Sequence, residues 1–490
     1  MSRYIKKKKL QSLIEPHILN NLKGDQFELK NVISSNLLTW NRLDIAFKLL
    51  YLEYNNKSQF AKKFYSQHVK AFTLGSFQEY GNLNKNSIKK YIDSFEETFN
   101  NLKNNGFIKE KSLIPISNDN SILNGSHRIA SAIFLNKKVD CVYLNLHNQI
   151  YDYNFFTKRH LSDDILDIAV SKFIEYSNNT YIAFIWPSAQ GFDEKVGEII
   201  PNIIYRKDVN LNKTGAHNLL SQIYFEENWI GDINNNFIGT KGKLVKCFKT
   251  FNPIRVIAFQ EESLDKVLVI KDRIRKIFNI GKHSIHITDT KKETVEASRI
   301  IFNKNSIHFL NFSNPNKYKS THNKIAKFKS FLNKHKIDSN KVIIDSSLVL
   351  SAYGIREAND IDFLMDNSFQ FNNDNSLINI HDDDLKWHKK TKNDLIYNPS
   401  NYFYFNEIKF LSFSLLYDMK KRRGEVKDKN DCKMMDALIH KNRAKKIVSK
   451  FNQEFFYFKA KSKSKIMKIS EFFGVYKIVR WFYRLLLKSE

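Results

Sequence analysis

Residues 345–362 of the chain read DSSLVLSAYGIREANDID, and apolar residues flank this stretch on both sides. It ends in two carboxylates, Asp360 and Asp362, that are separated by one residue. Residues two apart in a strand point to the same face of the sheet, so both carboxylates should project together. Hard oxygen ligands held in this way suit Mg²⁺, which proteins usually hold with one or two carboxylates plus substrate phosphates. The pattern therefore predicts a magnesium site at Asp360 and Asp362.

Two hydroxyl residues, Ser346 and Ser347, stand upstream of the carboxylates, where hydroxyls and turn amides would hold a triphosphate. The whole stretch resembles the nucleotidyltransferase fold, whose pattern is a Gly-Ser or Ser-Ser turn followed by Asp-x-Asp on a strand. The resemblance implies a mixed sheet with helices, Mg²⁺ and a nucleoside triphosphate such as ATP or CTP. The first motif of that family normally has Gly where Ser346 stands, and Gly lets backbone approach a ligand closely. A non-catalytic nucleotide-binding scaffold is therefore an alternative.

The same family is expected to place a third carboxylate on a neighbouring strand. Glu407, within the alternating segment YFYFNEIKF at 402–410, is the best-placed candidate, and the alternative is a strand residue that faces water. The aspartates at 382–384 and at 394 are the other candidates for this third carboxylate.

Several cations accompany this motif. We expect Arg356 and Lys427 to contact the phosphates with the two serines, since a cation reaches a triphosphate as a point charge. The run KKRR at 420–423 precedes Lys427 and a predicted helix, and its alternative interpretation is a solvated basic face.

The composition of the whole chain limits the class of protein. Its 490 residues should form about three domains. The net charge of +28 indicates an anionic partner, which is nucleic acid, a phospholipid surface or a phosphorylated substrate. Cys141, Cys247 and Cys432 show no paired spacing, which fits a reducing compartment and neither a disulfide scaffold nor a zinc site. Without a signal-like apolar run or a membrane-spanning stretch, the expected location is the cytoplasm.

A second motif, Asn124-Gly125-Ser126-His127-Arg128, opens a predicted helix over 129–135. Backbone amides and cations at a helix N-terminus favour a phosphate. The alternative is that His127 and Arg128 only cap the turn and pair with a carboxylate.

The order of elements around this motif resembles the ParB/sulfiredoxin fold, with a Pro-Ile strand at 114–116, a Gly-x-His-Arg turn and a following helix. Free-serine kinases belong to that fold, and the resemblance implies that Gly125 to Arg128 bind a phosphate. Ser126 stands where sulfiredoxin chemistry needs a cysteine. Glu79 lies roughly where the kinase-type members have an acidic residue, which implies a base for a substrate hydroxyl.

The middle of the chain has strand-like and helix-like patterns at 254–259 and 264–277, followed by His283 to Thr290. Asp289 or Thr290 would cap the next helix, and with Thr290 as cap Glu293 takes the third position of a capping box. The order Ile-His-x-Thr-Asp-Thr…Glu resembles the active-site segment of nucleoside diphosphate kinases, which implies a phosphoryl-carrying role for His286. The alternative is a structural histidine.

The C-terminal segment 466–488 is strongly amphipathic, with four cations at helical spacing on one face and Trp481 among the apolar residues. Such a helix either lies on anionic lipid, at the inner face of the membrane, or docks on the body of the protein.

Together these patterns predict an α/β and α+β multidomain protein. The expected parts are a helical segment (1–76), a ParB/sulfiredoxin-like domain (77–150), a middle α+β domain (160–325), a nucleotidyltransferase-like domain (326–450) and the basic tail (451–490). The expected function is Mg²⁺-dependent nucleotidyl or phosphoryl transfer to a sugar or small polar acceptor. Similar modules in bacterial surface-polysaccharide biosynthesis suggest that setting. The alternative is a nucleic-acid-binding or RNA-modifying protein.

Overall fold

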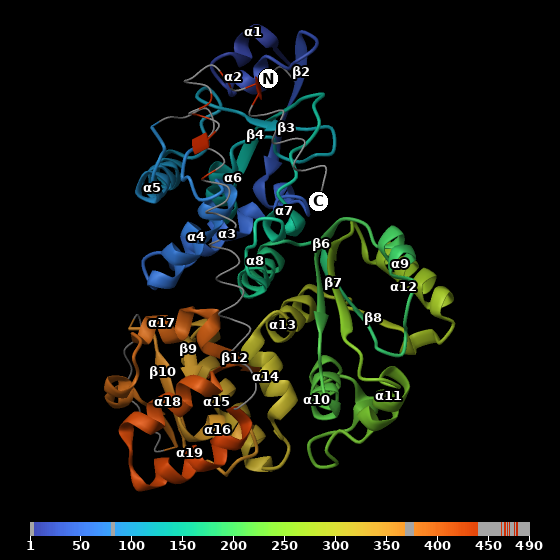
Figure 1. The fold of residues 1–490 in the computed structure, drawn as a ribbon, viewed down its shortest axis with the longest axis vertical. Helices are drawn as coiled ribbons and strands as arrows, with labels where there is room; N and C mark the ends of the chain where they lie inside the picture. Colours follow the sequence, from blue (N-terminus) through green and yellow to red (C-terminus); the bar gives the residue numbers. More distant parts are fainter. Residues whose placement is uncertain are drawn as a thin grey trace.

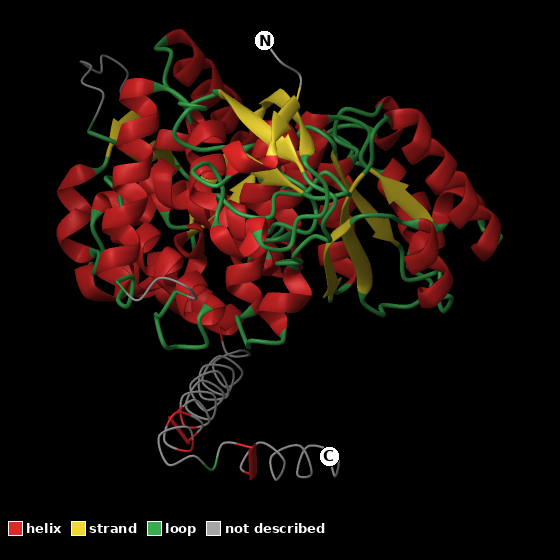
Figure 2. Ribbon diagram, turned by 90° about the horizontal axis from the view of Figure 1, so that it is seen from above, coloured by secondary structure: helices red, strands yellow, loops and turns green. Residues whose placement is uncertain are grey.

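The computed structural model describes residues 4–79, 84–367 and 377–439, together with a few single residues between 462 and 478. In these ranges the chain forms three sheets, two mixed and one antiparallel, each with its own helices (Figure 1). Figure 2 shows the same sheets from above, flanked by helices. The predicted mixture of helices and strands is thus confirmed. The predicted tail helix at 466–488 lies outside the described residues, apart from a few single positions.

The N-terminal sheet has the order β1-β2-β4-β3, in which β3 and β4 are parallel and the other pairs are antiparallel. Its strands are β1 (Tyr4–Lys6), β2 (Gln26–Ile33), β3 (Ile114–Ile116) and β4 (Lys138–Tyr143). The helices of this part are α1 (Lys7–Leu10), α2 (Pro16–Leu19), α3 (Asp44–Tyr54), α4 (Gln59–Phe72), α5 (Ile88–Asn105), α6 (Ser126–Phe134), α7 (Tyr153–Thr157) and α8 (Asp163–Tyr176).

The strand predicted at 114–116 and the helix predicted after the Gly125 turn are present. The boundary expected at residue 76 is absent from this sheet, because β1 and β2 supply half of its strands. The prediction of a mainly helical segment over 1–76 missed them. Only one side chain of β2 is fully buried, so its sequence lacks a clean apolar alternation.

The middle sheet has the order β6-β7-β5-β8 with every neighbouring pair antiparallel. Its strands are β5 (Thr180–Ile185), β6 (Ile203–Val209), β7 (Ile254–Gln260) and β8 (Ile285–Ile287). α9 (Asp193–Ile199) follows β5 and α12 (Leu264–Phe278) follows β7, while two further helices lie between β6 and β7. The other helices are α10 (Lys213–Ile223), α11 (Gly239–Cys247), α13 (Lys291–Ile301) and α14 (Lys304–Phe312).

Alternation along β5 separates two cores in the middle part. Ala183 and Ile185 pack with residues of α9 and α12, whereas Ile182 and Phe184 join the large core that continues into the N-terminal part. Because side chains alternate between the faces of a strand, one short apolar run serves both cores. The N-terminal and middle parts therefore share a hydrophobic core.

The C-terminal sheet has the order β11-β10-β9-β13-β12. Its strands are β9 (Val342–Ile344), β10 (Ile361–Met365), β11 (Ile378–Ile380), β12 (Tyr402–Phe405) and β13 (Ile408–Leu411). The helices are α15 (Lys319–Lys334), α16 (Ser347–Ala352), α17 (Lys392–Tyr397), α18 (Phe413–Arg423) and α19 (Val426–Ile439). β10 runs antiparallel to β9 and parallel to β11, and β13 runs parallel to β9. The end of β9 and the start of β10 therefore lie at the same end of the sheet. We call this end the edge formed by β9 and β10.

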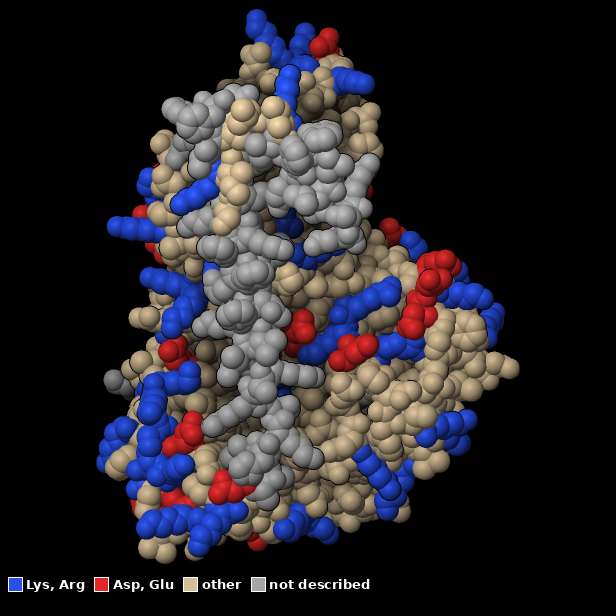
Figure 3. All heavy atoms as spheres, viewed as in Figure 1, with Lys and Arg blue, Asp and Glu red and all other residues tan. Residues whose placement is uncertain are grey.

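Charge is spread widely over the surface. On the face drawn in Figure 3, Lys and Arg occur over all three parts and are interspersed with Asp and Glu. In the described part of the chain, no helix combines the length and the apolar character that a bilayer span needs.

Candidate functional site

The edge where β9 ends and β10 begins brings together the serines and the aspartates of the 345–362 stretch. The backbone N–H of Asp345 donates to the carbonyl oxygen of Asp362 at 2.9 Å, which ties the turn to the strand. Ser347 Oγ donates to Asp360 Oδ1 at 3.0 Å, and the side chain of Ser346 hydrogen-bonds Asp362. The hydroxyls that we expected to hold a triphosphate hold the carboxylates in this structure.

Ser346 has an unusual backbone conformation, with φ 57° and ψ −127°. These angles match the first central position of a type II′ turn, which Gly dominates. A residue with a Cβ held there costs of order 1–3 kcal/mol and persists only where its surroundings enforce it, which is common at ligand sites. The position is the one where the nucleotidyltransferase pattern has Gly. Ser346 therefore holds a turn conformation that Gly would adopt without strain.

A third aspartate, Asp345, lies at the same edge and was not assigned a role from the sequence. It is fully buried, with His388 Nε2 at 3.2 Å and His381 Nδ1 at 3.7 Å from its Oδ2 atom. Burial alone would raise the pKa of Asp345, but the two histidines outweigh it and hold the pKa well below its ordinary value. Its position directly before the serine pair was the available signal.

His381 follows β11 and connects this edge to the segment after it. Its Nε2 atom lies 2.9 Å from Asp384 Oδ2, while its buried Nδ1 atom has no hydrogen-bond partner among the described residues. Burial lowers the pKa of His381, but Asp345, Asp362 and Asp384 outweigh this and raise it. A buried polar atom without a partner indicates a site that a ligand or water completes.

The remaining aspartate, Asp362, is a buried carboxylate in an acidic neighbourhood. Burial raises its pKa, and the adjacent Asp360 and Asp345 raise it further, although His381 opposes them. Such a site favours a cation, because a positive charge relieves both the desolvation and the repulsion.

Asp360 and Asp362 fit the one or two carboxylates that Mg²⁺ takes when substrate phosphates complete its shell. No group of three or more His, Cys, Asp or Glu residues within the described ranges is placed to hold a metal ion by itself.

Arg356 and Lys427, which we expected at the phosphates, have other partners. Arg356 makes a bidentate ion pair with Asp431, at 2.7 and 3.0 Å, and Asp431 also pairs with the buried Lys420 at 2.9 Å. Lys427 is exposed and pairs with Glu425 at 3.2 Å. The cations of α18 and α19 thus form an ion network with buried aspartates, which includes Asp428 bound by Lys420 and Arg423.

The structure does not bring Glu407 to Asp360 and Asp362. The segment 402–410 is a hairpin of β12 and β13, and Asn406 and Glu407 form its turn with φ of 47° and 65°. Both positive angles are typical of a two-residue type I′ turn, so strand alternation does not apply to Glu407. Because β13 runs parallel to β9, the residue before β13 lies at the opposite end of the strands from Asp345, which follows β9. Glu407 instead pairs with Lys329 at 2.6 Å and Lys292 at 3.3 Å.

The rival aspartates also have partners. Asp382 pairs with Lys392 at 2.8 Å, and Asp394 accepts a hydrogen bond from Ser58. Asp384 contacts His381, as described above, so it is the rival that lies nearest to the site.

The turn at Gly125 begins α6, with Gly125 in the left-handed region at φ 89°. His127 is buried, with Nε2 2.7 Å from the hydroxyl of Tyr65, and burial holds its pKa well below the ordinary value. Arg128 pairs with Glu15 at 3.0 Å. These contacts are those of the alternative in which both side chains support the turn. Ser126 is the first residue of the helix.

Glu79 is half exposed and pairs with Lys85 at 3.3 Å. Its charge acts on Tyr65 and Tyr91, so it lies near the ring that hydrogen-bonds His127. Glu79 therefore lies near the Gly125 turn.

His286 lies on β8, the edge strand of the middle sheet. Its Nε2 atom is 2.9 Å from Glu293 Oε1, and the other carboxylate oxygen of Glu293 accepts a 2.7 Å hydrogen bond from the Asp289 backbone. Thr290 caps α13 by accepting from the Glu293 backbone N–H at 3.1 Å, as one of the two expected caps. His286 is thus an oriented histidine with a carboxylate partner, an arrangement that suits a base or a nucleophile.

Compared with known proteins, the chain matches no family model, no curated sequence and no solved structure.

Proposed function

We propose that the protein is a Mg²⁺-dependent nucleotidyl- or phosphoryltransferase whose nucleotide binds at the edge formed by β9 and β10. The acceptor in this proposal is a sugar or small polar head group, in the setting of bacterial surface-polysaccharide biosynthesis. The acceptor and setting rest on the resemblance of the 345–362 stretch to nucleotidyltransferases.

The observation that carries the proposal is the strained turn at Ser346 directly opposite Asp360 and Asp362. A non-glycine residue at φ 57° is retained at a cost, and such outliers concentrate where backbone must meet a ligand. The two aspartates beside it form a site with excess negative charge, which is what a metal–triphosphate complex requires of its protein ligands.

Each residue has a role in this proposal. Asp360 and Asp362 would hold Mg²⁺, which when bound neutralises phosphate charge and orients the triphosphate. Ser346 and Ser347 keep the two carboxylates on one side of the turn through their hydrogen bonds. Asp345 keeps His381 and His388 in place beneath the site.

The test is calorimetry of the full chain with ATP and CTP, in the presence of Mg²⁺ and in the presence of chelator. Binding should require Mg²⁺, and a variant with Asp360→Asn and Asp362→Asn should bind at least about tenfold more weakly, because the metal loses its charged ligands. Asp272→Asn removes an exposed carboxylate of α12 and serves as the matched control. A wild-type chain that ignores both nucleotides would overturn the proposal.

The product released from the bound nucleotide then separates the two reactions. Attack at the α-phosphate releases pyrophosphate, whereas transfer of the γ-phosphate leaves a nucleoside diphosphate. Incubation of the Mg²⁺ complex with a panel of sugars and polyols, followed by detection of both products, decides which bond is broken.

A further inference from the structure

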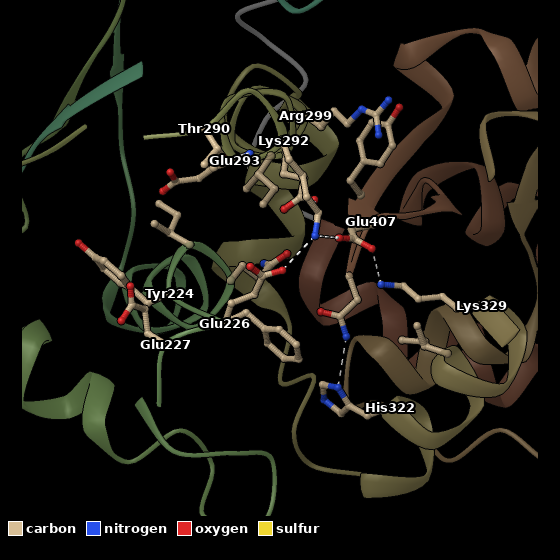
Figure 4. Close-up of a pocket in the computed structure, with 18 of the residues that line it drawn as sticks. Tyr224, Glu226, Glu227, Thr290, Lys292, Glu293, Arg299, His322, Lys329 and Glu407 are labelled. Carbon is tan, nitrogen blue, oxygen red and sulfur yellow. Dashed lines mark hydrogen bonds and ion pairs between the residues drawn. The ribbon is translucent and has the colours of Figure 1, made fainter. Parts of the chain in front are cut away.

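A cavity of about 610 Å³ lies between the middle and the C-terminal parts, away from the edge formed by β9 and β10 (Figure 4). Its walls come from the end of α10 and the following residues, from β8 and α13, from α15, and from the β12–β13 turn. A concave site of this size suits a small molecule.

The walls carry more acidic than basic side chains. Six acidic residues line the cavity, namely Glu226, Glu227, Asp289, Glu293, Glu296 and Glu407, against three basic ones, namely Lys292, Arg299 and Lys329. The bases are already engaged, since Lys292 pairs with Glu226 at 2.9 Å and Lys329 with Glu407 at 2.6 Å. Arg299 pairs with Glu175, which is outside the cavity. A protein with a net charge of +28 thus has a negatively charged cavity.

Two of these carboxyls, Glu296 and Glu407, lie beside each other and interact through a side-chain hydrogen bond. Burial, together with the bond to Glu407, raises the pKa of Glu296 to about 7. Burial also acts on Glu407, but the bonds from Lys329 and Glu296 outweigh it and lower its pKa to about 2. The two neighbouring carboxyls thus disfavour each other's negative charge, and a cation between them would relieve this repulsion.

His286 and aromatic rings complete the walls of the cavity. His286 is 9% exposed, and its Nε2 atom lies 2.9 Å from Glu293 Oε1. Phe225 adds aromatic surface to the same walls, whereas Tyr224 and Tyr404 already face Lys243 at 4.7 Å and Arg299 at 5.2 Å. Carboxylates together with aromatic faces are the groups that recognise an ammonium ion.

We propose that this cavity binds a small organic molecule with a protonated amine, held by Glu296, Glu407 and Glu226. The amine donates to the carboxylates, and His286 accepts or donates a further hydrogen bond through Nδ1. An amino sugar and a polyamine share this chemistry, and both fit the volume.

Two other ligand classes fit the cavity less well. The described residues contain no group of three or more His, Cys, Asp or Glu that is placed to hold a metal ion, so a bare divalent cation is disfavoured. A phosphate would meet more carboxylates than cations in a partly enclosed space, where like charges repel strongly. The same repulsion opposes a phosphoryl-carrying role for His286.

The site is independent of the proposed nucleotide site. Glu407 and Asp360 lie at opposite ends of the strands of the C-terminal sheet, because β13 runs parallel to β9 and β10 runs antiparallel to it. The two proposals can therefore fail separately.

The test is calorimetry of the full chain with glucosamine and with putrescine at millimolar concentration. The uncharged analogues N-acetylglucosamine and 1,4-butanediol are the ligand controls. At least one amine should bind, and its affinity should fall at least about tenfold when Glu296→Gln and Glu407→Gln are combined, because a charge-assisted contact is lost. Glu262→Gln, which removes an exposed carboxylate paired with Lys266, should leave the affinity within about twofold.

The affinities of the two amines identify the class of ligand. A site for an amino sugar should bind glucosamine more tightly, and a site for a linear polyamine should bind putrescine more tightly. Binding of neither amine, equal binding of an uncharged analogue, or unchanged affinity in the double variant would overturn the proposal. If the double variant does not fold, Glu226→Gln replaces it, because that side chain is exposed and its loss should still weaken the amine.

Discussion

Ser347 Oγ and Asp360 Oδ1 lie 3.0 Å apart, so a hydroxyl at the start of α16 holds the carboxylate that precedes β10. The hydroxyl donates and the ionised carboxylate accepts, which fixes Asp360 beside the turn rather than in solvent. This contact joins the two halves of the 345–362 stretch, and the strained Ser346 directly precedes Ser347.

The strain at Ser346 predicts an inverted preference between alanine and glycine. Ser346→Gly should be more stable than Ser346→Ala by about 1 kcal/mol, because only Gly adopts φ 57° without a penalty and both variants lack the hydroxyl. Urea unfolding of the two variants measures the difference. At Ser94, inside α5, the order should be the usual one, with Gly the less stable by about 1 kcal/mol. Equal stability of the two Ser346 variants would contradict the strain.

Because of the buried Lys409, we expect the free energy of unfolding to rise with pH. It is fully buried on β13, and burial, with Arg299 nearby, lowers its pKa from 10.5 to about 7. The folded-state pKa is below the unfolded value, so between pH 7 and 10.5 the unfolded chain binds more protons and folding becomes more favourable as pH rises. The contribution is about 1.4 kcal/mol per pH unit in that window.

Denaturant unfolding at several pH values measures this slope for the wild type and for Lys409→Met. The variant should lose the contribution, so the difference in unfolding free energy between the two proteins changes between pH 7 and 9. Lys266→Met, at an exposed position, is the control and should leave the slope unchanged. Parallel curves for the wild type and Lys409→Met would show that the buried amine keeps its ordinary pKa.

We expect Arg128 and Glu15 to stabilise the fold as an ion pair, and we do not expect Arg128 to bind phosphate. A double-mutant cycle with Arg128→Ala and Glu15→Ala should give a coupling free energy of about 1 kcal/mol, because the 3.0 Å pair is partly shielded from solvent. Inorganic phosphate should not raise the melting temperature of the wild type more than that of Arg128→Ala. A phosphate-dependent stabilisation that requires Arg128 would instead support the phosphate site expected from the sequence.

Asp431 is predicted to be a structural residue of the C-terminal part. Asp431→Asn should lower the free energy of unfolding by about 3 kcal/mol, because it leaves the charge of the buried Lys420 less compensated. Arg356→Lys should cost about 1 kcal/mol, since Lys cannot form the bidentate pair. Thermal unfolding measures both changes. Wild-type stability in Asp431→Asn would indicate that the network contributes little.

Local patterns of the chain were enough for several elements of the fold and the site. Two-residue periodicity placed Asp360 and Asp362 beside one turn, and Thr290 was one of two residues expected to cap α13. These features depend on neighbours within a few positions, and backbone geometry determines which side chains then share a face.

Tertiary structure decided which distant residues share a site. The parallel pairing of β11 with β10 carries His381 to Asp345, and the parallel pairing of β13 with β9 carries Glu407 to the opposite edge and into the cavity. Strand order depends on contacts between residues that are far apart in the chain, and these leave no local periodicity to detect. The carboxylate pair of Glu296 and Glu407 therefore exists only in the folded protein, because α13 and the β12–β13 turn meet there.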